Sequence, residues 1–158
     1  MSSRQSHKKK SNTMQQLLLK LLQLISDRFP ILSLVAEDCG QLETQEDTYP
    51  VTFPCLLIGN TDINWQDLTE GGTDQRGTAT ITVRLAIDCY DDVHIGSTQE
   101  QSIYERLQLA HDIHEVIQGV EFEECPDVWP LSRIKSRDVT LPGHIKVYES
   151  IYRFIIQD

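Results

Sequence analysis

The chain has 158 residues, ordinary hydrophobic content and a formal net charge of −10 at neutral pH. This length allows one domain whose core is large enough to fold without disulfide or metal staples. Positive charges gather at the beginning, in Arg4 and residues 8–10, so the rest of the chain is more acidic still. An acidic body repels phosphate backbones, which argues against binding of nucleic acid over its surface. Residues 1–11 are polar, basic and aperiodic, and they predict a flexible arm before a single domain over residues 12–158.

The four cysteines are scattered, without a C-x-x-C pair. They are Cys39, Cys55, Cys89 and Cys125. Two of them fall in apolar strand patterns, where a thiol behaves as a small hydrophobe. Their spacing indicates neither a metal site nor a disulfide framework, and no apolar run reaches transmembrane length. We therefore expect a soluble cytoplasmic protein with no cofactor and no membrane partner.

The first predicted element is an amphipathic helix that begins near Asn12 or Thr13 and is stopped by Pro30. Its apolar side is broad, comprising Met14, Leu17, Leu18, Leu21, Leu22, Leu24, Ile25 and Phe29. Leu19 falls on the polar side, where it is either an isolated exposed leucine or part of a partner surface. Residues 31–36 follow as a possible edge strand, and an acidic loop covers residues 41–48.

Two apolar segments predict the core strands of a sheet. Residues 53–58 form a continuous apolar run, and residues 79–89 alternate at a period of two. The connection between them, residues 60–77, is polar and contains two adjacent glycines. It is too long for a tight hairpin loop, so we expect an excursion that folds on itself or contacts a partner. Trp65 and Leu68 are its candidate contact residues.

A second helix is predicted from the capping-box spacing of Ser97 and Glu100 to a C-cap glycine at Gly119. Its expected apolar stripe is Ile103, Leu107, Ala110, His114 and Ile117, widened by Leu109, Ile113 and Val116. Such an arc exceeds what one sheet face covers, which favours burial against another subunit.

The chain closes with two further predicted strands. Residues 131–140 form a polar strand in which Leu131, Arg133, Lys135 and Arg137 share a face. Residues 147–156 are apolar on both sides, with Ile151 and Ile155 on the second face, as in a central strand or one that meets a neighbour. The order of elements predicts an α+β fold of two layers, in which two main helices pack on a mostly antiparallel sheet of about four to five strands.

Candidate sites for chemistry are few. His111 and His114 resemble metal ligands, but both the H-E-x-x-H spacing and its third ligand are missing, so packed or satisfied histidines are favoured. Asp88, Asp91 and Asp92 are typical of solvated acids at a strand end. Residues 71–77 lack the lysine–hydroxyl pair of a phosphate-binding loop. We expect no enzymatic activity and no catalytic, cofactor-binding or metal-binding residue.

The order and spacing of several segments over residues 13–157 resemble the bacteriophage tail completion or tail terminator (minor tail) protein family. The chain is similar to the version encoded in prophage-like regions of Bacteroidetes genomes. The segments, after the N-terminal helix, are Gly40-Gln41-Leu42, residues 53–58, Trp65-x-x-Leu68, residues 75–85, the later helix, Leu131-x-Arg133 and residues 147–154.

The resemblance implies a ring-forming subunit, commonly of a hexamer, that ends the tail tube and helps join it to the head. The implied partners are further copies of itself, the tail-tube protein and head–tail connector proteins. The implied location is the cytoplasm of the bacterial host during assembly and then the virion tail. Candidate oligomer or partner contacts are Leu19, Trp65, Leu68, Leu109, Val116, Ile151 and Ile155. Two alternatives stay open: a small intracellular binding module using residues 60–77, and a metal-dependent enzyme using His111 and His114.

Overall fold

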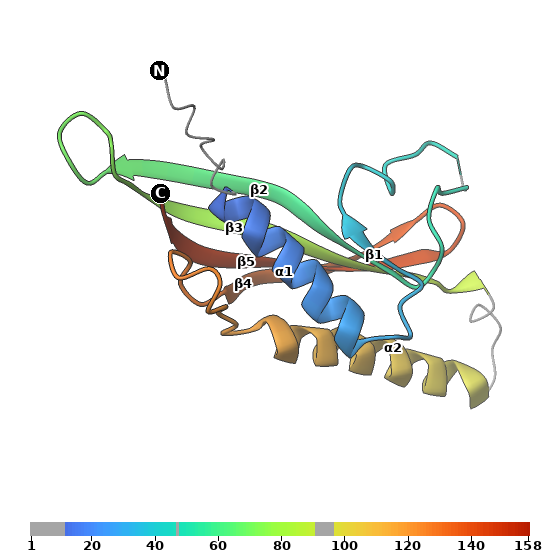
Figure 1. The fold of residues 1–158 in the computed structure, drawn as a ribbon. Helices are drawn as coiled ribbons and strands as arrows, with labels where there is room; N and C mark the ends of the chain where they lie inside the picture. The colour runs from blue at the N-terminus through green and yellow to red at the C-terminus, as the bar shows by residue number, and fades with distance from the viewer. Residues whose placement is uncertain (1–11, 47, 91–96) are drawn as a thin grey trace, which may run out of the picture.

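The computed structural model describes residues 12–46, 48–90 and 97–158. Within these residues the chain forms two helices and one five-stranded sheet (Figure 1). The elements are α1 (Thr13–Arg28), β1 (Leu34–Glu37), β2 (Cys55–Asp67), β3 (Gln75–Asp88), α2 (Ser97–Ile117), β4 (Ser132–Leu141) and β5 (Ile145–Gln157). The strand order is β1-β2-β3-β5-β4, with β1 parallel to β2 and the other neighbours antiparallel. The predicted α+β fold is confirmed.

Helix α1 begins and ends where its sequence predicts. The Asn12 side chain accepts a hydrogen bond from the backbone N–H of Met14 at 2.8 Å, which satisfies one of the free donors of the first turn. Leu17, Leu21 and Ile25 recur every four residues and are fully buried. Arg28 is the last helical residue, two positions before Pro30. The side chain of Leu19, on the opposite side, is 59% exposed.

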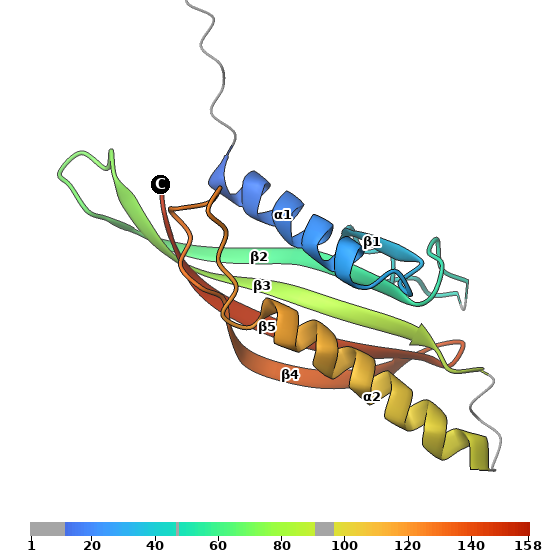
Figure 2. The same ribbon diagram turned by 60° about the horizontal axis from the view of Figure 1, so that its bottom comes forward.

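Both helices pack on the same face of the sheet (Figures 1 and 2). The core between them takes its helical part from the stripe of α1 and from Ile113 and Ile117 of α2. The sheet contributes alternate residues of its middle strands: Leu56 and Ile58 of β2, Ala79, Ile81, Val83 and Leu85 of β3, and Tyr152, Phe154 and Ile156 of β5. Cross-strand pairs such as Ile81 with Tyr152 lie side by side in this layer.

The other face of the sheet has a smaller core at one end. There Leu42, from the loop between β1 and β2, packs with Cys55, Leu57, Ala86, Ile145 and Val147. Both faces of the central strands are therefore covered at this end, which accounts for the continuous apolar run of residues 55–58.

The prediction that residues 60–77 form a long excursion between the strands is wrong. Strand β2 continues to Asp67 and β3 begins at Gln75, and the two pair antiparallel until Asp67 faces Gln75. Only residues 68–74 form a loop. We call residues 60–77 the hairpin extension, and Figure 1 shows it projecting beyond the helices. Most of its residues are polar and exposed, and the two apolar side chains Ile63 and Trp65 are too few to give a clear alternating signal.

A register shift between Gly59 and Asp62 separates the extension from the core part of β2. Asn60 there has φ 52°, a left-handed conformation that asparagine tolerates better than most residues. Further along, a Cβ atom on Gly77 would lie 2.6 Å from a methyl of Ile63 and 3.1 Å from the ring of Trp65. Because Gly77 has no side chain, Ile63 and Trp65 occupy the space beside it, and the paired part of the extension is closely packed there.

The buried face of α2 also differs from the predicted stripe. Its centre is Ile113 with Ile117, and Leu109 and Val116 pack against the same core. Ile103 and Leu107 are instead exposed, because the N-terminal half of α2 lies clear of the strands (Figure 2). The sequence pattern identified an amphipathic helix, but its wide arc left the direction of the buried side undetermined.

We expect Leu21→Ala to lower the free energy of unfolding by about 2–5 kcal/mol, because it opens a cavity under α1. Leu19→Ala is the matched control on the same helix, and it should change stability by less than about 0.5 kcal/mol. Urea denaturation of both variants measures the difference. Equal losses in the two variants would contradict the packing of α1 described here.

Candidate functional site

The two histidines of α2 lie apart and have separate partners. His111 is exposed and pairs along the helix with Glu115, Nε2 to Oε1, at 3.2 Å. His114 lies beneath the helix, where its Nδ1 is 2.8 Å from the Tyr152 hydroxyl and its ring stacks on that ring. Burial, followed by the positive charge of Arg133, lowers the pKa of His114. The described part of the chain contains no group of three or more His, Cys, Asp or Glu residues placed to hold a metal ion.

The acidic cluster after β3 is only partly within the described residues. The carboxylate of Asp88 accepts a hydrogen bond from the backbone N–H of Tyr90 at 3.0 Å, which is a local turn contact. Asp91 and Asp92 lie outside the described residues. The hydrogen bond of Asp88 explains its position without a ligand.

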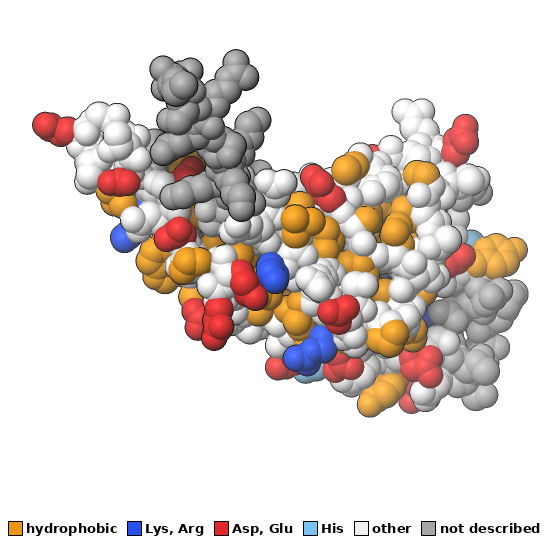
Figure 3. Space-filling view, viewed as in Figure 1, with side chains coloured by type: hydrophobic (Ala, Val, Ile, Leu, Met, Phe, Trp, Pro, Cys, Tyr) orange, Lys and Arg blue, Asp and Glu red, His pale blue; other side chains and the backbone are white. Residues whose placement is uncertain are grey.

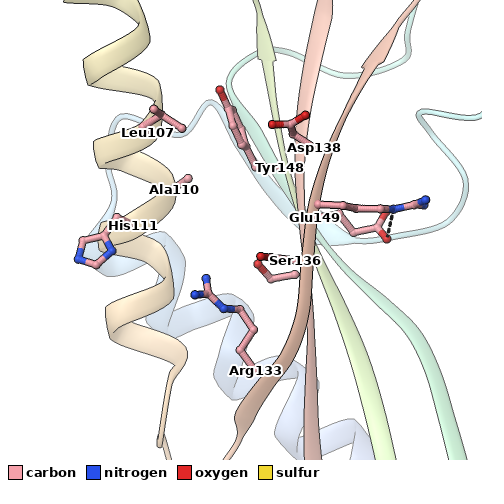
Figure 4. A pocket seen from close by; sticks show the side chains of 10 residues that line it. Leu107, Ala110, His111, Arg133, Ser136, Asp138, Tyr148 and Glu149 are labelled. Atoms are coloured by element: carbon pink, nitrogen blue, oxygen red, sulfur yellow. Dashed lines mark hydrogen bonds and ion pairs between the residues drawn. The ribbon is translucent and has the colours of Figure 1, made fainter.

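A pocket of about 390 Å³ lies between α2 and the last two strands (Figure 4). Arg133 and Ser136 extend from β4 toward the helix, whereas His111 is turned away from the strand. Leu107 and Tyr148 form apolar parts of the wall. The two carboxylates of the lining are each paired with a cation, Asp138 with Lys146 and Glu149 with Arg137.

A buried ion-pair network fastens the loop between β1 and β2 to the sheet. Arg84 of β3 is 9% exposed, and its Nε donates to a carboxylate oxygen of Asp38 at 2.7 Å. Its two terminal nitrogens donate to both carboxylate oxygens of Glu43, at 2.7 and 3.1 Å. The bond from Arg84 holds the pKa of Glu43 below its usual value. The sequence signal for this network was an arginine within an otherwise apolar strand, but its partners could not be named from it.

The predicted contact residues fall on three separate surfaces. Leu19 is on the outer side of α1, and Trp65 and Leu68 are exposed on the hairpin extension. Ile151 and Ile155 are half-buried on the sheet face away from the helices, opposite Thr82 and Thr78. Figure 3 shows the helix-covered side, where hydrophobic groups form several separate clusters with acidic side chains between them. Leu109 and Val116 pack against the core of their own chain.

The shape of β4 differs from the predicted regular strand. A bulge between Arg133 and Lys135 places Arg133 opposite Tyr152 and Lys135 opposite Ile151. Because adjacent residues of β5 point to opposite faces, these two side chains do not share a face, contrary to the prediction. The residue at the bulge, Ile134, is 55% exposed.

The sheet has two unpaired edges. On one side, β1 pairs with β2 only over residues 55–58, so among the described residues no strand borders the outer edge of the hairpin extension. On the other side, β4 pairs with β5 and has no described strand beyond it. Edges of this kind present free backbone donors and acceptors, which can pair with another chain.

Comparison with known proteins shows a likeness in structure only. No protein-family model matches the chain, and no curated protein matches it significantly. Among solved structures, a chain of one described as "Virion of native gene transfer agent (GTA) particle" aligns with a TM-score of 0.51. The alignment covers 89% of this chain and 92% of that chain, with 9% identical residues. The two chains share a fold over nearly their whole lengths.

No helix among the described residues combines the length and the apolar character needed to cross a membrane.

We expect Arg84→Ala to lower the free energy of unfolding by roughly 3–5 kcal/mol, because it leaves the carboxylate of Asp38 buried without its partner. Lys20→Ala removes the exposed pair with Glu124, and this control should cost less than about 1 kcal/mol. Chemical denaturation at neutral pH compares the two variants. Similar small losses would show that the network does not hold the loop.

The lowered pKa of Glu43 predicts how this stabilisation depends on pH. The folded-state pKa lies below the unfolded value, so the contribution is complete above the ordinary glutamate pKa and is lost as the pH falls through the folded value. In Glu43→Gln the loss of stability on acidification should be smaller than in the original chain. Thermal unfolding measured from pH 6 down to pH 3 tests this; identical slopes would contradict it.

Proposed function

We propose that this chain is a non-enzymatic structural protein of a phage-like particle. In this role it assembles into a ring that caps or completes the tail tube and helps join the tail to the head. The observation that carries the proposal is the fold shared with a chain of the gene transfer agent virion particle, matched over 89% of this chain and 92% of that one. The sequence resemblance to tail completion proteins favours the tail over other parts of a virion.

Two features of the molecule support an assembly role. The unpaired sheet edges and the exposed apolar residues of the hairpin extension, Trp65 and Leu68, are suited to contacts between subunits. The acidic composition suits a ring through which DNA passes without adhering, because like charges repel. The proposed partners are further copies of the chain, the tail-tube protein and connector proteins. The proposed locations are the host cytoplasm and then the virion tail.

The chemistry of the described residues favours this role over the metal-dependent enzyme. His111 pairs with Glu115 on the outside of α2, while His114 is hydrogen-bonded beneath it, so the two rings do not converge. The binding-module alternative finds less support in the hairpin extension, because residues 60–67 and 75–77 are paired strand rather than a ligand-binding loop.

The tail role is tested with the tail-tube protein of the proposed particle. We expect gold-labelled chain to bind one end of preassembled tubes in electron micrographs, and added tube protein to lengthen only the uncapped end. An unrelated acidic protein of similar size is the control. Labelling along the tube walls, or unchanged growth at both ends, would refute the proposed function.

A further inference from the structure

The two unpaired edges of the sheet carry opposite charges. The hairpin extension holds Asp62, Asp67, Glu70 and Asp74 against a single basic residue, Arg76. Strand β4 holds Arg133, Lys135 and Arg137 against a single acidic residue, Asp138. In a chain whose overall charge is −10, β4 is a local exception, because it is basic along an exposed edge.

Some of these charges are already paired within the chain, and others are not. Arg137 binds Glu149 at 3.0 Å, and Asp138 binds Lys146 at 3.3 Å. By contrast, Arg133 and Lys135 form no ion pair with any described side chain, although both are exposed.

The acidic edge shows the same lack of partners. Asp62, Glu70 and Asp74 are exposed and form no ion pair with a described residue. Apolar groups accompany the charges on both edges: Trp65 and Leu68 on the extension, and Ile134 at the bulge of β4. Each edge therefore combines a strand with no described strand beyond it, unneutralised charge of one sign and exposed apolar side chains, although the backbone N–H of Arg133 is bound by the Gln118 side chain.

We propose that the hairpin extension of one copy pairs, through the outer edge of β2 over residues 60–67, with the outer edge of β4 of a second copy. This proposal rests on the ring assembly proposed above and names the surfaces that form it. The edges lie on opposite sides of the same sheet, so each copy uses one edge for each neighbour. Such a contact is heterologous, which is the kind that produces rings or filaments rather than closed two-fold dimers.

The two edges also lie at different ends of the strands. Residues 62–67 are in register with residues 75–80 of β3, whereas β4 lies beside the part of β5 that pairs with residues 80–88. A copy added in this way is shifted along the strand direction. Closed sheets accommodate such a shift by tilting their strands against the axis of closure, so the geometry is compatible with a ring.

Charge reversal separates this interface from other modes of association. The first variant carries Asp62→Lys, Glu70→Lys and Asp74→Lys, and the second carries Arg133→Glu and Lys135→Glu. All five positions are exposed and outside the core, and unchanged circular dichroism and melting temperature serve as the folding control. Sedimentation velocity at low salt, over a concentration series, gives the self-association constant of each protein.

We expect each variant alone to associate at least about tenfold more weakly than the original chain, because like charges then face each other across the interface. An equimolar mixture of the two variants should recover association, since each basic edge again meets an acidic one. A chain carrying all five substitutions should also associate with itself. The mixture should form alternating assemblies that contain equal amounts of both variants.

Several results would overturn the interface. One is that either variant alone associates as well as the original chain, and another is that the mixture of the two variants stays dissociated. A further one is that the original chain remains monomeric both at millimolar concentration and on tube ends. Charge-independent capping of tubes would refute this interface while the proposed function stands. Charge-dependent assembly without binding to tube ends would support the interface and refute the proposed function.

Discussion

The structure depends on the burial of one face of strand β3 beneath two helices. Ala79, Ile81, Val83 and Leu85 alternate along this strand and belong to the same buried cluster as the stripe of α1 and Ile113 and Ile117 of α2. The strand also lies at the centre of the sheet, paired on one side with β2 and on the other with β5. All fourteen residues of β3 are paired with a neighbouring strand. One end of β3 therefore belongs to the core and the other end to the hairpin extension.

The opposite face of β3 carries a charged side chain that needs compensation. Arg84 lies between apolar neighbours, and its charge is compensated by two carboxylates from the loop before β2. Burying a guanidinium is costly unless each of its donors finds an acceptor, and this loop supplies them. The loop in turn brings Leu42 over the second core. One polar contact thus holds an irregular segment of the chain against a regular sheet.

The elements that were predictable from the sequence are those with a buried side and a local end signal. Helix α1 has a four-residue apolar repeat, a capping asparagine and a terminating proline, and β3 has strict alternation along its core part. The hairpin extension has none of these, because most of its residues are polar, and its strands are defined by pairing, of β2 with β3 and of the start of β3 with the end of β5. Long-range pairing of this kind is not encoded by a local period.

The candidate site was also only partly predictable from the sequence. Trp65 and Leu68 could be proposed as contact residues from residue type and spacing, and so could two histidines that do not converge, of which His114 is packed and His111 is paired at the surface. The opposite charges on the two edges could not, because neither edge existed as such before the strand order was known. The bulge at Ile134 also changed which face each basic residue of β4 occupies, and a one-residue shift of register leaves no mark in composition.

The hairpin extension has a mechanical consequence. A loop of eighteen residues would yield to a load at its tip, but here only residues 68–74 lie outside the strands, and residues 75–77 are bonded to β2 on one side and to the end of the chain after Ile155 on the other. Gly77, opposite Trp65 and near the outer end of the paired strands, is closely packed against Ile63, Trp65 and Ile156. A force on the tip is therefore transmitted along β2 and β3, which also carry the core. It reaches the residues that pack beneath α1.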